Sequence, residues 1–209
     1  MLCLKKLKTF IKINKTGVTL LKIIVSGTPG VGKHTISSEL SRLLNRIPIL
    51  DINKVILSEN LLTPSCENEV NIEKTFNSLK LILSTKEYDD AIIVGHLAPY
   101  VVDPLLVDFI IILRRCPYEL KKIYEIRSYS KKKIYDNIVS EILGIISYDF
   151  LKKFNKKDIS ELEINENVLP YVYAQKIIDM YANKNLREFG IIDWLPLIQS
   201  DPSMIKFLM

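Results

Sequence analysis

Three of the seven glycines of this 209-residue chain fall within six residues of one another, in a segment that could bind a phosphate group. The segment reads Gly27-Thr-Pro-Gly30-Val-Gly32-Lys33-His34-Thr35. Glycines let the backbone curl so that successive N–H groups point at one anion, and a following helix adds its positive dipole end. Lys33 can then reach the outer phosphates of a nucleoside triphosphate. The spacing therefore predicts a phosphate-binding loop and a protein that handles a nucleotide.

The residues on either side of this loop support the same interpretation. Ile23, Ile24 and Val25 form a short apolar run that is typical of a central parallel strand. Apolar residues at helical spacing follow the loop, namely Ile36, Leu40, Leu43 and Leu44. The alternative is a strand-to-helix turn without a ligand, and the joint presence of glycines, lysine and flanking elements argues against it.

His34 departs from the usual pattern, in which Ser or Thr follows the loop lysine and its hydroxyl holds Mg²⁺. A neutral imidazole is a poor match for magnesium, which prefers oxygen ligands. Thr35 comes next and keeps a hydroxyl nearby. The substitution weakens the case for direct metal ligation while leaving the case for nucleotide binding intact.

The rest of the chain alternates strands and helices, which predicts a parallel sheet with helices on both faces. Four further strands are expected at 47–50, 91–94, 109–113 and 162–164. Helices are expected at 72–83, from Pro117, through one long segment carrying Ile134 to Ile145, and last at 171–181. Because ligands of such sheets lie at the carboxyl ends of the strands, the loop, His96 and Arg114 should share one edge. The polar, helix-broken segment 51–71 and the break at 128–130 should lie above it as flaps.

Composition limits the remaining choices. The length and the 48% hydrophobic content suit one α/β domain, and no apolar run is long enough for a membrane span. Five lysines in residues 1–17 account for the net charge of +5, so the body has no basic footprint for sequence-specific nucleic-acid binding. We interpret residues 1–17 as an extension, either a disordered arm or an upstream start, before a domain at 18–209. Cys3, Cys66 and Cys116 form no CxxC pair, which fits reduced thiols in a cytoplasmic protein.

Several segments together resemble the adenylate kinase superfamily, and more narrowly the archaeal and eukaryotic adenylate kinase isoenzyme 6 group, from about Val18 to Trp194. They are the loop 27–33, Gly95-His96-Leu-Ala98, Leu113-Arg114-Arg-Cys-Pro117 and Ile192-Asp193-Trp194. The most specific segment is 127–143, Arg-Ser-Tyr-Ser-Lys-Lys-Lys-Ile-Tyr-Asp-Asn-Ile-Val-Ser-Glu-Ile-Leu. It is similar to the group's Arg-Gly-Tyr-Ser-x-x-Lys-x-x-Glu-Asn-x-x-x-Glu-x-Leu.

The resemblance implies a three-layer P-loop NTPase fold with a five-stranded parallel sheet and two small inserts. One insert is an NMP-binding region at about 50–73, and the other is a lid at about 126–136. It also implies a kinase that moves a phosphoryl group from ATP to AMP or another nucleoside monophosphate, with Mg²⁺ held largely through water and an associated ATPase activity. A transient contact with a small-subunit ribosomal protein, during late maturation of the small-subunit RNA, is implied as well.

The resemblance also implies roles for single residues. The nucleotide contacts would be Gly30, Gly32, Lys33, His34, Thr35 and Arg127, and no side chain is assigned as a direct metal ligand. The catalytic residues would be Lys33, Arg127 as the lid arginine, and His96 as a group that orients phosphate or water. We interpret Arg114 as structural, and we expect Lys133 and Asn137 to fix the lid helix rather than touch substrate.

Four positions depart from the group's pattern and leave two hypotheses open. Val94 replaces an acid before Gly-His, Ile123 a second lid arginine, Ser128 the lid glycine and Asn71 an aspartate. Asp51, Asp89 and Asp90 are candidates for the missing acid. The first hypothesis is a monophosphate kinase with reduced turnover, and the second is an ATP-responsive ribosome-assembly factor with little kinase activity. A GTPase is disfavoured because the nearest candidate for a base-specific Asn-Lys-x-Asp motif, residues 183–186, lacks the aspartate.

Overall fold

A five-stranded parallel sheet forms the centre of the molecule. The computed structural model describes residues 21–63 and 69–201, so the extension expected at 1–17 lies outside them. The strands are β1 (Lys22–Ser26), β2 (Ile49–Asp51), β3 (Ala91–Val94), β4 (Phe109–Arg115) and β5 (Ile159–Ile164). They are ordered β2-β3-β1-β4-β5, and each neighbouring pair is parallel. The predicted doubly covered parallel sheet is confirmed.

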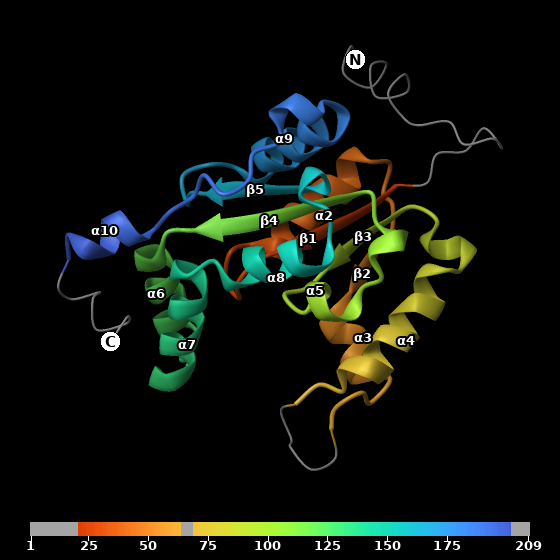
Figure 1. Ribbon diagram of the computed structural model, residues 1–209, viewed down its shortest axis with the longest axis horizontal. Coiled ribbons are helices and arrows are strands. Elements are labelled where there is room, and N and C mark those ends of the chain that lie inside the picture. The colour runs from red at the N-terminus through yellow and green to blue at the C-terminus, as the bar shows by residue number, and fades with distance from the viewer. Residues whose placement is uncertain (1–20, 64–68, 202–209) are drawn as a thin grey trace.

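Helices cover both faces of the sheet and make three layers (Figure 1). One face carries α2 (Lys33–Leu43), α6 (Pro117–Ile126), α7 (Lys131–Ile142), α9 (Pro170–Ala182) and α10 (Leu195–Gln199). The other carries α3 (Ile52–Ser58), α4 (Ile72–Leu83), α5 (Ala98–Val101) and α8 (Ile145–Lys153). Short 3₁₀ turns occupy Lys86–Tyr88, Pro104–Leu106, Lys156–Asp158 and Lys184–Leu186. Helices α6, α7 and α10 lie beyond the arrowhead of β4 in Figure 1, at the carboxyl edge of the sheet.

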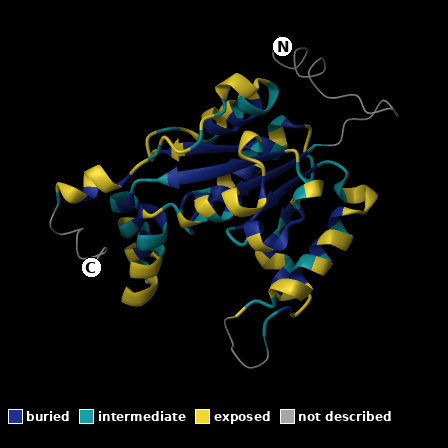
Figure 2. Cartoon of the chain, in the orientation of Figure 1, coloured by how far each residue is buried: buried dark blue, intermediate teal, exposed yellow. Residues whose placement is uncertain are grey.

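Strand residues alternate between two separate hydrophobic cores. Ile23 and Val25 of β1 pack into the core shared with α2 and α9, whereas Ile24 between them packs into the core shared with α4 and α8. All five residues of β1 are buried, as expected for a central strand with both faces covered. Figure 2 shows the sheet mostly buried, with the exposed residues on the outer faces of the helices and in the loops. This rigid sheet fixes the point at which the phosphate loop leaves β1.

The structure corrects the expectation that residues 51–71 are helix-broken. Asp51 ends β2 and also caps α3, because its carboxylate accepts hydrogen bonds from the backbone N–H groups of Asn53 and Lys54. Helix α4 comes later in the chain, and its bounds are those that the sequence predicted. The short β2 begins at Ile49 rather than at residue 47.

The expected long helix carrying Ile134 to Ile145 is also wrong, because it is two helices. Leu143 caps α7, and Gly144 has a left-handed φ of 61° that turns the chain into α8. An added Cβ at Gly144 would lie 3.3 Å from the Nη1 atom of Arg114. The turn between α7 and α8 therefore packs against this guanidinium. Helix α9 is not the last one either, since the five-residue α10 follows Trp194.

Within residues 21–63 and 69–201, no helix is both long and apolar enough to cross a membrane.

Candidate functional site: a phosphate-loop cavity under a lid

The glycine-rich segment connects β1 to α2 with a backbone that only glycine adopts readily. Gly27, Gly30 and Gly32 have φ values of 131°, 91° and 98°. An added Cβ at Gly27 would overlap the carbonyl oxygen of Leu113, so the loop also lies tightly against β4. Helix α2 begins at Lys33, directly after Gly32, and the first-turn N–H groups of this helix face the loop. The strand, loop and helix predicted from the sequence are therefore present.

Lys33 is buried beneath this loop and held by it. Its ammonium group donates to the carbonyl oxygens of Gly27 at 2.8 Å and Thr28 at 2.9 Å. Burial lowers the pKa of Lys33 to about 8, the charge of Glu141 opposes that shift, and the charge of Arg127 adds to it. Burial of this charged ammonium group therefore costs free energy, and a bound polyphosphate would stabilise the charge.

A cavity of about 620 Å³ opens over the loop and brings together most of the predicted site residues. Its walls combine the loop and α2 with the lid and with the ends of β2 and β3. The lining residues are Pro29, Gly30, Gly32, Lys33, His34, Thr35, Asn53, His96, Arg127, Tyr129, Lys133, Asp136 and Asn137. Every residue that the resemblance implied as a nucleotide contact or catalytic group lines this cavity. Their roles in binding and catalysis stay predictions.

His96 follows β3 and lines the cavity. Burial, together with the positive charges of Lys33 and Lys133, lowers its pKa to about 4. The imidazole is therefore neutral at physiological pH and has one donor and one acceptor nitrogen. Such a group can orient a phosphate or water by hydrogen bonding without adding charge.

Two tyrosines connect residues 126–136, which we interpret as a lid, to the loop. The Tyr124 hydroxyl donates to the carbonyl oxygen of Pro29 at 2.5 Å, and the ring of Tyr129 stacks on Tyr124 with centroids 5.4 Å apart. Arg127 caps α6 between them, and Ser128 has a left-handed φ of 53° at the position where the resembled group has glycine. Ser128 therefore adopts a backbone conformation that glycine accepts at little cost.

Two lid residues contribute more to the site than the sequence suggested. Lys133 and Asn137 were expected only to fix the lid helix, yet both line the cavity, as does Asp136. The Lys133 ammonium lies 4.1 Å from the centroid of the Tyr129 ring, in a cation–π contact between two residues that line the cavity. The spacing of Lys133 and Asn137, one helical turn apart in the motif, was the available signal.

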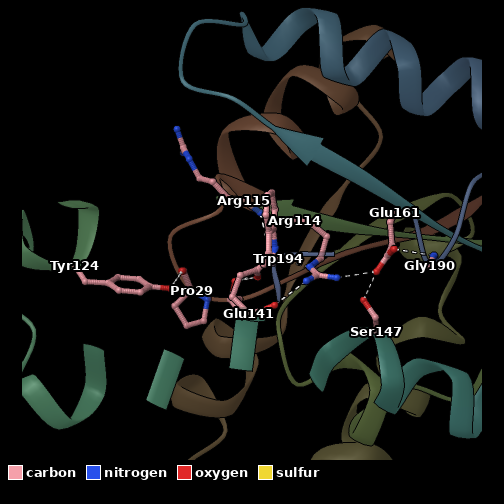
Figure 3. A network of polar contacts seen from close by, with 10 residues as sticks. Pro29, Arg114, Arg115, Tyr124, Glu141, Ser147, Glu161, Gly190 and Trp194 are labelled. Carbon is pink, nitrogen blue, oxygen red and sulfur yellow. Dashed lines mark hydrogen bonds and ion pairs between the residues drawn. The ribbon is translucent and has the colours of Figure 1, made fainter. Parts of the chain in front are cut away.

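Arg114 lies outside the cavity and is structural, in agreement with its interpretation from the sequence. It is 4% exposed and sits between two buried carboxylates, with Nε 2.7 Å from Glu141 and Nη1 3.0 Å from Glu161 (Figure 3). Burial opposes its charge, but the charges and hydrogen bonds of the two carboxylates outweigh burial and raise its pKa. The Glu161 carboxylate also accepts hydrogen bonds from the Ser147 hydroxyl and from the Gly190 N–H.

Of the three candidates for the missing acid, only Asp51 contacts a residue of the cavity wall, although it does not itself line the cavity. Val94, which replaces the expected acid, is fully buried at the end of β3. Asp90 precedes β3 and accepts a hydrogen bond from the backbone of Leu21, which places it and neighbouring Asp89 at the opposite end of the sheet. Asp51 pairs with Val94 in the ladder, and its Oδ2 lies 3.6 Å from Nδ1 of His34. Among the described residues, no group of three His, Cys, Asp or Glu could chelate a metal.

The sequence is similar to those of known proteins. Residues 23–144 match the family described as an AAA domain. A protein of Methanosarcina barkeri described as "Putative adenylate kinase" is 32% identical over 186 residues, which cover 83% of this chain and 97% of the relative. The chain belongs to this adenylate kinase family. A second member, from Methanocaldococcus jannaschii, is 31% identical over 175 residues and covers 83% and 93% of the two chains.

Solved structures support the fold of this adenylate kinase family member. A shikimate kinase from Bacteroides thetaiotaomicron superposes with a TM-score of 0.56, at 16% identity, over 77% of this chain and 97% of that one. A shikimate kinase from Acinetobacter baumannii gives a TM-score of 0.52, at 17% identity, over 83% and 96%. The chain therefore has a P-loop kinase fold.

Proposed function

We propose that the protein is a nucleoside monophosphate kinase of the adenylate kinase type, which moves the terminal phosphoryl group of ATP to AMP or another monophosphate. The observation that carries this proposal is the convergence of Lys33, Arg127 and Lys133 on one cavity over a phosphate loop. Three cations from two separate segments suit a ligand with several phosphates. Family membership supports the same activity.

Charge neutralisation and positioning would be the main contributions of these residues, because phosphoryl transfer needs little covalent help from the protein. Backbone N–H groups of the loop and the first turn of α2 would hold the β- and γ-phosphates. Lys33 would exchange its two carbonyl contacts for phosphate oxygens. Arg127 and Lys133 would stabilise the negative charge of the transferring group from the lid side. Neutral His96 would orient the acceptor phosphate or a water molecule by hydrogen bonding.

Magnesium fits this site if it is held through water. Thr35 and Asn53 bring oxygen donors to the cavity wall, whereas His34 occupies the usual position of the direct hydroxyl ligand. Bound with ATP, magnesium would supply positive charge that offsets the charge of the phosphates. Thr35, Asn53 and the nearby Asp51 are the residues that would surround it.

A coupled assay of ADP formation from ATP, Mg²⁺ and a panel of monophosphates tests the proposal. We expect ADP formation that depends on the added monophosphate and falls at least 100-fold in Lys33→Ala. ATP hydrolysis that ignores every monophosphate would contradict a kinase and leave an ATPase. The absence of any ADP above the Lys33→Ala background would contradict both activities.

A second candidate function is an ATP-responsive assembly factor for the small ribosomal subunit, with weak hydrolysis and little kinase activity. Two features favour it: His34 at the metal-ligand position and buried Val94 in place of an acid. Its expected partner is a small-subunit ribosomal protein. Affinity capture with ATP, in parallel with Lys33→Ala, tests this candidate. Recovery of no small-subunit protein in the presence of ATP would contradict it.

A further inference from the structure

We infer that Asp51 supplies the carboxylate that positions magnesium-bound water at this site, in place of the acid that is missing at Val94. The inference rests on the proposed function, because it concerns the metal that accompanies ATP. It gives Asp51 a positioning role and does not make it a direct ligand.

The sheet register places Asp51 beside Val94, the position at which the expected acid is missing. Asp51 is the partner of Val94 in the parallel ladder between β2 and β3. Neighbouring strands are roughly 4.8 Å apart, so the carboxylate is moved sideways by one strand while it stays at the carboxyl edge. An acid lost from β3 is therefore replaced by an acid at the end of the adjacent strand.

The two carboxylate oxygens of Asp51 have different neighbours. Oδ1 accepts from the N–H groups of Asn53 at 2.9 Å and Lys54 at 3.4 Å, as the cap of α3. Oδ2 lies 3.6 Å from Nδ1 of His34. The side chain is 11% exposed, whereas that of His34 is 62% exposed. Asp51 is thus held rigidly behind His34 and Asn53, the two residues next to it that line the cavity.

The charge of Asp51 reaches the nucleotide cavity from this position. It opposes the loss of charge on Lys33, so the carboxylate and the loop ammonium interact across the floor of the site. Magnesium keeps several of its waters when it binds with a nucleotide, and these waters donate hydrogen bonds to nearby carboxylates. Removing such an outer partner typically lowers metal affinity by roughly 10- to 100-fold.

The test is the Asp51→Asn variant, because asparagine keeps the capping oxygen and removes the charge. Two affinities are measured: that of ATP in excess EDTA by calorimetry, and that of Mn²⁺ for the protein–ATP complex by electron paramagnetic resonance. We expect Mn²⁺ affinity to fall at least about tenfold while the affinity for metal-free ATP changes less than about twofold. Asp51→Ser keeps a capping oxygen in a different side chain and should behave alike. Asp90→Asn, which removes an acid at the far end of the sheet, should change neither value.

Unchanged Mn²⁺ affinity in Asp51→Asn would overturn the inference and leave the proposed function untouched. An equal loss of ATP affinity with and without metal, in both Asp51 variants, would also overturn it, because Asp51 would then be purely structural. Failure of the unaltered protein to bind ATP is a separate result, and it would overturn the proposed function together with this inference.

Discussion

Thr28 of the phosphate loop donates a hydrogen bond of 2.5 Å to the carboxylate of Glu141, which lies 113 residues later in α7. The same carboxylate accepts from Nε of Arg114 at 2.7 Å and from the indole N–H of Trp194 at 3.1 Å. One buried side chain therefore connects the phosphate loop, the end of β4, the helix that carries the lid, and the C-terminal segment (Figure 3). The shape of the loop depends on contacts that are distant in sequence.

We expect Glu141→Gln to lower the free energy of unfolding by about 3 kcal/mol. The substitution removes a negative charge that balances buried Arg114, and it places an amide N–H₂ where the surrounding groups are all hydrogen-bond donors. Urea denaturation followed by circular dichroism measures the change. Glu163→Gln is the matched control, since Glu163 is exposed in β5 and its replacement should change stability by less than about 0.5 kcal/mol. Similar midpoints for both variants would contradict the role given to Glu141.

Two of the loop glycines, Gly27 and Gly32, should differ in their tolerance of a side chain. Gly27→Ala adds a methyl group that overlaps the Leu113 carbonyl oxygen in β4, so it should destabilise the protein by more than about 3 kcal/mol. Gly32→Ala has open space around its Cβ and meets only the strain of a left-handed backbone, about 1–2 kcal/mol. Thermal melts of the two variants measure this order, and equal melting temperatures would contradict the tight approach of the loop to β4.

Acid should destabilise the protein through His96. Burial lowers its pKa from the ordinary value of 6.5 to about 4, so below pH 6.5 the unfolded chain takes up the proton first. The stability that neutral His96 gives is complete above pH 6.5 and is lost as the pH falls toward 4. Unfolding free energies measured at pH 7 and pH 5 should show a loss on the order of 1 kcal/mol from this group. His96→Gln should reduce that loss, and an unchanged pH dependence would show that His96 is not buried as described.

ATP binding should take up protons at pH 8 through Lys33. Because its pKa is about 8 in the protein alone, the ammonium is partly deprotonated there, and a polyphosphate beside it would raise that pKa. Calorimetry in buffers of different ionisation enthalpy should detect uptake of about half a proton at pH 8 and much less at pH 6. Lys33→Met should abolish the uptake. Equal proton exchange at both pH values would mean that Lys33 does not meet the phosphates.

Local patterns in the sequence predicted the loop, the sheet and the position of the cavity. The loop glycines and the apolar run at 23–25 act over short distances, so their structures follow from spacing, whereas the lid at 126–136 was implied by the resemblance of residues 127–143 to a known family. The side-chain roles that depend on register were harder to predict. Asp51 was one of three candidate acids, and only the pairing of β2 with β3 separates it from Asp89 and Asp90.

The two wrong expectations about helices have different physical causes. Ile134 to Ile145 keep a helical spacing, yet Gly144 turns the chain so that α8 can pack on the opposite face of the sheet from α7. Helix α3 was missed because its start signal, Asp51, also belongs to a strand.

Calorimetric titration of ATP into the unaltered protein and into Lys33→Ala tests the central claim most directly, namely that the loop at 27–35 binds a polyphosphate with the help of one buried ammonium. We expect one site per chain and an affinity at least tenfold weaker in Lys33→Ala, with melting temperatures that show both proteins folded. Equal affinities, or no binding of any nucleoside triphosphate to the unaltered protein, would contradict the account.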